Sequence, residues 1–301
     1  MENYLISIVT FGAFYALLAL GLNLIWGMTG MINLGLAGFF AFGAYASALV
    51  TTAGGMPILL GLIVAVAAAG AAGALLTLIT MRLRGDYLAI VTLGFSEVIR
   101  LIAANEIWLT NGTDGISGIP GPLKGSLDPA GFNLLFAGIA LAVVVAMVFL
   151  AQRLRHSPYG RVLRAIRDDD LVAAVAGKRV RRFKVQAFAL GAGLMGLAGA
   201  LYGHYTSYIA PDIFRPLITI YIFLALTAGG TGNNVGAVLG GFLVMAVLEA
   251  TRFIAEIAPD LPGAQLAALR EILVGTILIV VMRIRPQGLI PERIATRSDR
   301  P

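Results

Sequence analysis

Apolar stretches without charges alternate along the chain with short polar or glycine-rich segments. Four of these stretches have roughly 20 residues or more, enough for a helix to cross about 30 Å of hydrocarbon. They are residues 4–26, 34–53, 57–80 and 132–151. The pattern predicts helices that span a membrane.

Five further stretches carry a weaker form of the same signal, because each is short, interrupted or contains a polar residue. They are residues 88–104, 185–203, 217–228, 235–248 and 264–282. We therefore expect nine crossings in an all-α, polytopic transmembrane helix bundle, with eight and ten as the alternatives. The whole chain, residues 1–301, would form one transmembrane domain.

The composition narrows the functional classes. Hydrophobic residues make up 58% of the 301 positions and charged residues only 13%, whereas about a quarter of a soluble domain is charged. Nine crossings would leave too little chain for a large catalytic domain outside the membrane. The chain has no Cys and only two His, which excludes thiolate or histidine-rich metal sites, and we expect no metal.

The distribution of Lys and Arg predicts the orientation. Residues 152–184 hold ten of the 22 basic residues but only three acids. Basic loops stay on the cytoplasmic side, so this segment and the C-terminus are predicted to be cytoplasmic. With nine crossings the N-terminus then lies outside.

The basic segment also contains a helical pattern. The stretch RVLRAIRDDDLVAAVAG, residues 161–177, places Val162, Ile166 and Val172/Ala173 near one face of a single short amphipathic helix. Pro158 precedes this helix and Gly177 offers a cap after it. Such a helix can dock into a groove of a partner protein, or the segment can serve only as an orientation signal or a lipid-headgroup contact.

Two glycine-rich breaks interrupt apolar segments in the two halves of the chain. The first break is GMTGMINLG, residues 27–35, and the second is GGTGNNVGAVLGG, residues 229–241. Broken helices leave backbone groups that must face protein or a watery cavity, and they often mark a transport path. The candidate path residues of these breaks are Asn23, Asn33, Asn233 and Asn234. The alternative is that the glycines allow close packing and the asparagines cap helix ends.

Glu97 and Arg100 are further candidates for the path. They lie three residues apart, so they can neutralise each other on one helix face. Counting about 1.5 Å per residue from Tyr87 places Glu97 near the middle of the membrane, where charges are usually functional. The alternative is an ion pair buried in the bundle. His204 follows an apolar helix, and we expect it at the membrane interface rather than as a catalytic base.

Two motif searches argue against nucleotide chemistry in this chain. Residues 191–196 match G-x-G-x-x-G, but they lie inside a predicted membrane helix without a preceding strand, so helix packing explains them better. The phosphate-loop pattern G-x-x-x-x-G-K-[ST] does not occur in the sequence. We identify no catalytic residues and expect no cofactor bound by this chain.

Several long blocks carry a family resemblance. They are YALLALGLNLIWGMTGMINLGLAGFFAFGAYASA, RGDYLAIVTLGFSEVIR, NGTDGISGIPGP, YGRVLRAIRDDDLVAAVAGKRVRRFKVQAF, GLAGALYGHYTSYIAPDIF and RPQGLIP. In this order they resemble the LivM-type permeases of branched-chain amino acid ABC transporters, over nearly the whole chain.

The resemblance implies a subunit of a prokaryotic cytoplasmic (inner) membrane transporter. Its partners would be a second, LivH-like permease, two cytoplasmic LivG/LivF-like ATPases that hydrolyse the ATP, and a periplasmic or lipid-anchored amino-acid-binding protein. Residues 152–184 would then be the loop that couples the permease to an ATPase. The residues expected to carry coupling are Arg161, Arg164, Arg167, Asp168, Asp169, Asp170, Ala173 and Gly177.

The chain departs from related importers at two places. Leu171, Val172 and Ala173 stand where the EAA consensus of many importers has Glu-Ala-Ala, and Asn233 and Asn234 replace a small or apolar pair. The substrate therefore stays open between branched-chain amino acids and urea, short amides or aromatic acids. A self-sufficient secondary transporter or channel is a further alternative, and it would need more intramembrane carboxylates than Glu97.

Overall fold

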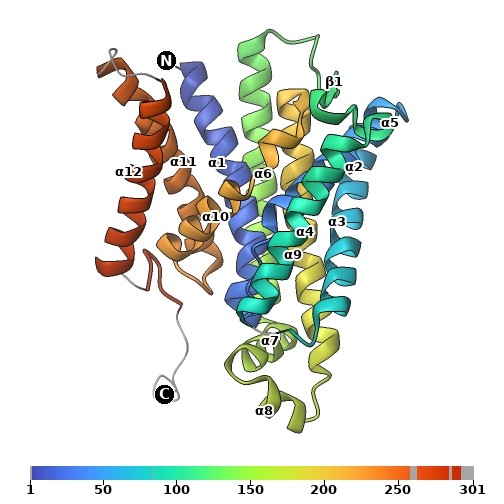
Figure 1. The fold of residues 1–301 in the computed structure, drawn as a ribbon, viewed down its shortest axis with the longest axis vertical. Helices are drawn as coiled ribbons and strands as arrows, with labels where there is room; N and C mark the ends of the chain where they lie inside the picture. Colours follow the sequence, from blue (N-terminus) through green and yellow to red (C-terminus); the bar gives the residue numbers. More distant parts are fainter. Residues whose placement is uncertain (1, 84, 258–262, 285–286, 293–301) are drawn as a thin grey trace.

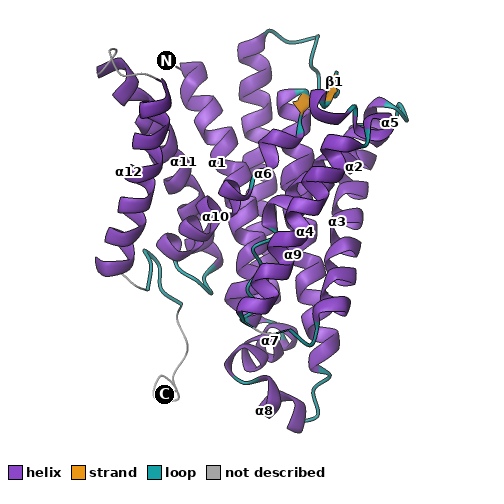
Figure 2. Ribbon diagram, in the orientation of Figure 1, coloured by secondary structure: helices purple, strands orange, loops and turns teal. Residues whose placement is uncertain are grey.

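The computed structural model describes residues 2–83, 85–257, 263–284 and 287–292 (Figure 1). These residues form a bundle of helices with one pair of two-residue strands (Figure 2). Strand β1 (Ile116–Ser117) pairs antiparallel with β2 (Tyr208–Ile209), and Ile116 lies opposite Ile209. The predicted all-α bundle is therefore confirmed.

Each predicted apolar stretch coincides with a helix in the described part of the chain. These helices are α1 (Glu2–Leu22), α2 (Leu36–Thr52), α3 (Ile58–Thr80), α4 (Asp86–Asn105), α6 (Pro129–His156), α9 (Val180–Thr206), α10 (Pro216–Gly229), α11 (Asn234–Ile257) and α12 (Gly263–Ile284). The shorter elements are the π-helical turn η1 (Asn23–Gly27), α5 (Ile107–Thr110), η2 (Gly112–Asp114), α7 (Pro158–Asp168), α8 (Asp170–Val175) and η3 (Pro211–Phe214).

Not all of the apolar helices have spanning length. Among the described residues, five helices are long and apolar enough to cross a bilayer: α1 with η1, α3, α4, α6 and α9. Helix α10 has 14 residues, or about 21 Å of axis, and it begins part-way along the bundle (Figure 1). The chain is therefore a multi-pass membrane protein, and its exact number of crossings stays a prediction.

Small residues bring α9 into close contact with α2 and α3. A Cβ added at Gly196 would lie 2.5 Å from Cβ of Ala69 and 2.8 Å from the carbonyl oxygen of Ala65. One added at Gly199 would collide with the carbonyl oxygen of Phe40 on α2. The glycines that mimic a dinucleotide motif therefore serve helix packing, as the sequence predicted.

Different elements lie at the two ends of the bundle. The start of α1 lies at one end, whereas α7 and α8 lie at the other (Figure 1). Five predicted crossings separate these segments, so opposite ends are the expected result. The predicted cytoplasmic C-terminus belongs to residues 293–301, outside the described residues.

His204 is buried within the protein, with only 1% of its surface exposed, and its predicted position at the membrane interface stays a prediction. Its Nδ1 donates a 2.7 Å hydrogen bond to the carbonyl oxygen of Pro120, and its Nε2 lies 2.9 Å from Oγ of Ser47. The ring is buried because it joins α9 to α2 and to the loop before α6. His204 is thus a buried structural contact.

Candidate functional site

The basic segment forms two helices instead of the single amphipathic helix predicted for residues 161–177. Helix α7 already begins at Pro158, and the chain breaks at Asp169 before α8 starts. Proline is tolerated at the first helical position, and Oγ of Ser157 accepts a 3.2 Å hydrogen bond from the amide of Gly160 as an N-cap. Pro158 therefore lies inside the helix and does not precede it.

Asp169 produces the break between the two helices. Its backbone is extended, and its Oδ1 accepts hydrogen bonds from the amides of Leu171 at 2.8 Å and Val172 at 3.1 Å. The carboxylate thus starts a new helix where the sequence pattern would continue the old one. Asp170 forms an ion pair with Lys184 at 3.0 Å, which ties α8 to the start of α9.

Gly177 ends α8 as predicted. It adopts a φ of +77°, which favours glycine. The amide of Gly177 donates to the carbonyl of Ala174, and the amide of Lys178 donates to the carbonyl of Ala173, both within 3.1 Å. This pair of bonds is a Schellman motif, so the predicted cap is confirmed.

The two helices bury one set of apolar residues and expose another. Leu163 and Ile166 of α7 are buried, and Leu163 packs with Leu24 and Met28 near the first break. The predicted buried face was therefore offset by one residue at Val162, which lies in the groove between the helices. Of the pair Val172/Ala173 on the predicted face, Ala173 is buried, whereas Val172 is 65% exposed.

The apolar residues of α8 are left uncovered. Leu171 and Val172 are mostly exposed, and Val175 is 92% exposed. A groove of about 610 Å³ separates α7 from α8. It is lined by Pro158, Arg161, Val162, Asp168, Asp169 and Val172, among others. We call α7, α8 and this groove the hairpin.

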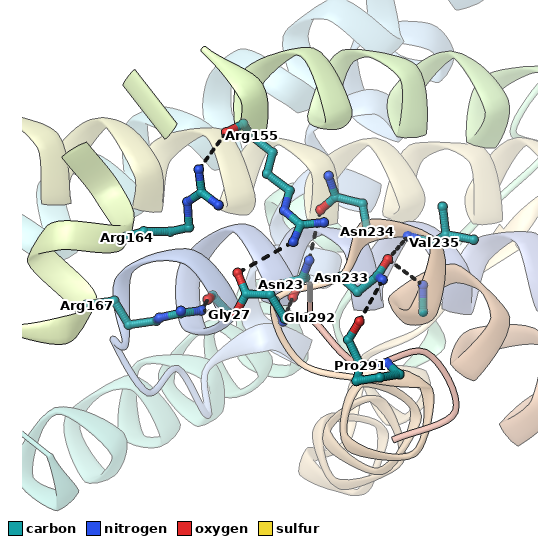
Figure 3. Close-up of polar contacts among 12 residues, drawn as sticks. Asn23, Gly27, Arg155, Arg164, Arg167, Asn233, Asn234, Val235, Pro291 and Glu292 are labelled. Atoms are coloured by element: carbon teal, nitrogen blue, oxygen red, sulfur yellow. Dashed lines mark hydrogen bonds and ion pairs between the residues drawn. The ribbon is translucent and has the colours of Figure 1, made fainter. Parts of the chain in front are cut away.

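Arg167 connects the hairpin to the first break. One of its guanidinium nitrogens donates a 2.6 Å hydrogen bond to the carbonyl oxygen of Gly27 and lies 2.8 Å from the carboxylate of Glu292 (Figure 3). Arg155, at the end of α6, approaches the other oxygen of Glu292 at 3.6 Å. Arg164 donates a longer bond, 3.5 Å, to the carbonyl oxygen of Arg155.

The two breaks meet in space through Asn23. Its side-chain amide donates to Oδ1 of Asn234 at 2.9 Å, and its Oδ1 accepts a 2.8 Å hydrogen bond from the amide of Gly232 (Figure 3). Both asparagines are fully buried. Gly27 allows this approach, because a Cβ there would collide with Oδ1 of Asn23 and lie 2.8 Å from the nitrogen of Gly232.

Asn233 lies beside this contact and caps α11. Its Oδ1 accepts from the amides of Val235 and Gly236, and its side-chain amide donates to the carbonyl oxygen of Pro291 at 3.3 Å. Residues 287–292, the C-terminal strap, also join the second break through their backbone. The amides of Leu289 and Ile290 donate to the carbonyls of Ala228 and Gly229 at 2.8 and 3.0 Å.

Asn33 and the pair Glu97–Arg100, which were also predicted to line the path, take no part in the described contacts between the two breaks. Asn33 is buried and accepts a hydrogen bond from the amide of Gly35, so it shapes the start of α2. Glu97 and Arg100 form an ion pair on a partly exposed face of α4. The nearest further charge is Asp212, whose carboxylate lies 3.8 Å from Arg100.

Arg155 and Glu292 were not among the predicted site residues. Arg155 was counted only as part of the basic segment, and Glu292 follows the predicted last crossing. Glu292 is the acid nearest to the RPQGLIP block, which is the signal that could have drawn attention to it. Its role depends on the contact between the strap and the second break. The hydrophobic and polar pattern of the sequence does not indicate this contact.

Comparison with known proteins places these features in a family. Residues 4–282 match the family model of branched-chain amino acid transport system permease components. The chain is 32% identical to the branched-chain amino acid permease LivM of Escherichia coli K12, over 95% of this chain and 70% of the relative. It is 30% identical to a probable LivM of Methanocaldococcus jannaschii, over 73% of this chain and 64% of the relative.

A second kind of relative matches as well. The LivH permease of Escherichia coli K12 is 26% identical over 94% of this chain and 92% of its own length. No solved structure matches the chain. The family match covers most of the chain, and the resemblance predicted from the sequence blocks is confirmed. This chain belongs to the family of permease components of branched-chain amino acid transport systems.

Proposed function

We propose that this chain is a membrane-spanning permease subunit of an ATP-driven importer for leucine, isoleucine and valine. Its partners are a LivH-like second permease, two LivG/LivF-like ATPases and a periplasmic or lipid-anchored amino-acid-binding protein. The observation that carries the proposal is the exposed hairpin at one end of a chain of this permease family. The names of the matched relatives favour branched-chain amino acids over urea, amides or aromatic acids.

The hairpin has the properties of a coupling element. Leu171, Val172 and Val175 present apolar side chains beside the charged residues of α7. Each such side chain contributes about 1.5–3 kcal/mol when a partner covers it completely. Insertion into an ATPase groove would therefore bind the hairpin and let movements of the ATPases reach the membrane helices.

The substrate chemistry suits a bundle with few charges. A branched-chain amino acid combines a zwitterionic headgroup with an apolar side chain, so the headgroup needs polar groups inside the membrane. Glu97 and Arg100 supply opposite charges on a partly exposed face of α4. Charged residues in a membrane helix normally face protein or a water-filled cavity, which favours a position between the two permeases.

The asparagines have a different proposed role. The two breaks are held together by Asn23, Asn233 and Asn234. These side chains would therefore determine the shape of the path without lining it. Asn33 would set the position of α2 in the same way. We also propose that the hairpin is cytoplasmic and the N-terminus outside, because the basic residues of the hairpin favour the cytoplasmic side.

Reconstitution into proteoliposomes tests the proposal. ATP supplied on the hairpin side should drive uptake of labelled leucine when the second permease, the ATPases and the binding protein are all present. The chain alone should transport nothing. Ion-coupled uptake by the chain alone would instead support a secondary transporter.

A substitution in the hairpin tests the docking role directly. Val175→Asp places a charge in the apolar surface of α8 and should prevent the ATPases from co-purifying with the permease. Leu123→Asp, in an exposed position of the loop before α6, is the matched control and should leave co-purification unchanged. ATPase binding by the Val175 variant at the wild-type level would refute docking through α8.

A further inference from the structure

The structure joins the hairpin to both breaks. Leu163 and Arg167 reach the first break, at Leu24 and Gly27. Arg167 also lies against the second break, because a Cβ added at Gly232 would be 3.2 Å from its Nη1. Glu292 of the C-terminal strap accepts a hydrogen bond from Arg167. Backbone hydrogen bonds join the same strap to the second break.

Glu292 is enclosed by these segments. Its side chain is only 12% exposed, and a Cβ added at Gly232 would lie 2.5 Å from its Oε2. Arg155 holds the second oxygen from α6, while Arg167 holds the first from α7. The carboxylate thus lies between a membrane helix, the hairpin and the second break.

The strap and the breaks form one connected unit. Backbone bonds from Leu289 and Ile290 fasten the strap to the end of α10, and Asn233 fastens it to the start of α11. Asn23 then ties the second break to the first. These hydrogen bonds form a contiguous network from Glu292 to both breaks, which is the kind of arrangement that can carry energetic coupling.

A cavity lies between the strap, the end of α6 and the second break. It has a volume of about 750 Å³. Its lining includes Gln152, Arg155, His156, Arg164, Asn233 and Leu289.

We infer that Glu292 is a positioning residue that transmits movement of the hairpin to the second break, so that both breaks move together when the ATPases close. This inference rests on the proposed function, because it takes the hairpin as the docking element for an ATPase. Glu292 does not contact substrate in this role. It acts through Arg167 on one side and the strap on the other.

The variant Glu292→Gln in the assembled transporter tests the inference. The amide keeps the shape of the side chain but removes the charge that attracts both guanidinium groups. We expect normal co-purification of the ATPases, retained ATP hydrolysis, and leucine uptake lower by about tenfold or more. Glu271→Gln, at an exposed acid of α12, is the matched control and should transport like the wild type.

A distance measurement separates transmission from a merely structural role. The chain has no cysteine, so spin labels attach only at cysteines introduced for Leu150 on α6 and Val235 at the second break, both exposed. ATP should change the distance between the labels in the wild-type background. The change should be absent in Glu292→Gln and partly restored in Glu292→Asp, with thermal stability unchanged.

The possible failures are distinguishable. If Val175→Asp still binds and responds to the ATPases, the proposed docking is wrong and the inference loses its basis. If that variant is uncoupled but Glu292→Gln retains wild-type uptake and the ATP-dependent distance change, docking stands and the role of Glu292 is overturned. Loss of stability in both Glu292 variants would also overturn it in favour of a structural role.

Discussion

The side-chain amide of Asn23 donates a 2.9 Å hydrogen bond to the side-chain oxygen of Asn234, although 211 positions separate them. The same Asn23 accepts a bond from the amide of Gly232. One side chain therefore satisfies groups of the second break that have no access to water. This contact makes the two breaks a single structural feature.

Replacement of this asparagine should loosen both breaks. Asn23→Ala leaves the buried amide of Gly232 and the oxygen of Asn234 without a partner, so we expect a loss of about 1–3 kcal/mol in unfolding free energy. Unfolding of the purified protein in mixed micelles measures the change. Asn105→Ala, at an exposed site on α4, should lie within about 0.5 kcal/mol of the wild type. Equal stabilities of the two variants would contradict the bridging role.

Close packing of α9 leads to a second prediction. Gly199→Ala would force the added methyl group against the carbonyl oxygen of Phe40, and we expect a loss of about 1–3 kcal/mol or misassembly. Gly138 on α6 has open space around it, so Gly138→Ala should be neutral or slightly stabilising through helix propensity. Thermal unfolding and membrane yield compare the two. A tolerated alanine at position 199 would show that α2 and α9 can separate.

The helices were predictable because a membrane imposes a simple length rule. Uninterrupted apolar runs such as residues 57–80 become helices wherever they occur, since every backbone group must be satisfied internally. The short α10 was predicted in both position and length, because the apolar run of residues 217–228 is already too short to cross a bilayer as a helix.

The candidate site was predictable only in parts. The glycine-rich breaks and the cap at Gly177 follow from local chemistry. Asp169 was read as one of three equivalent acids, because nothing in a run of aspartates shows which one will leave the helix and cap the next. The contacts of Asn23 and Glu292 join residues that lie far apart in the sequence. No local pattern of residues in a single sequence indicates such contacts.

Asp169 supports a third prediction, which separates capping from charge. Asp169→Ala removes both hydrogen bonds to the first turn of α8 and should weaken that helix by about 1 kcal/mol. Asp169→Asn keeps the capping oxygen without the charge, so it should preserve coupling. ATPase activity stimulated by the permease, together with leucine uptake, is the measurement. A coupling defect of equal size in both variants would indicate that the charge, and not the cap, is required.

Glu97 and Arg100 allow the transport role of α4 to be distinguished from a structural one. Arg100→Gln leaves Glu97 without its partner, and Glu97→Gln leaves Arg100 with only the more distant carboxylate of Asp212, so both variants should lower protein yield and uptake. The double variant removes both charges, so yield should recover because no uncompensated charge remains. If the pair faces the path, uptake per transporter should stay several-fold below the wild type in the double variant. Recovery of uptake together with yield would assign the pair to the stability of the bundle and remove it from the path.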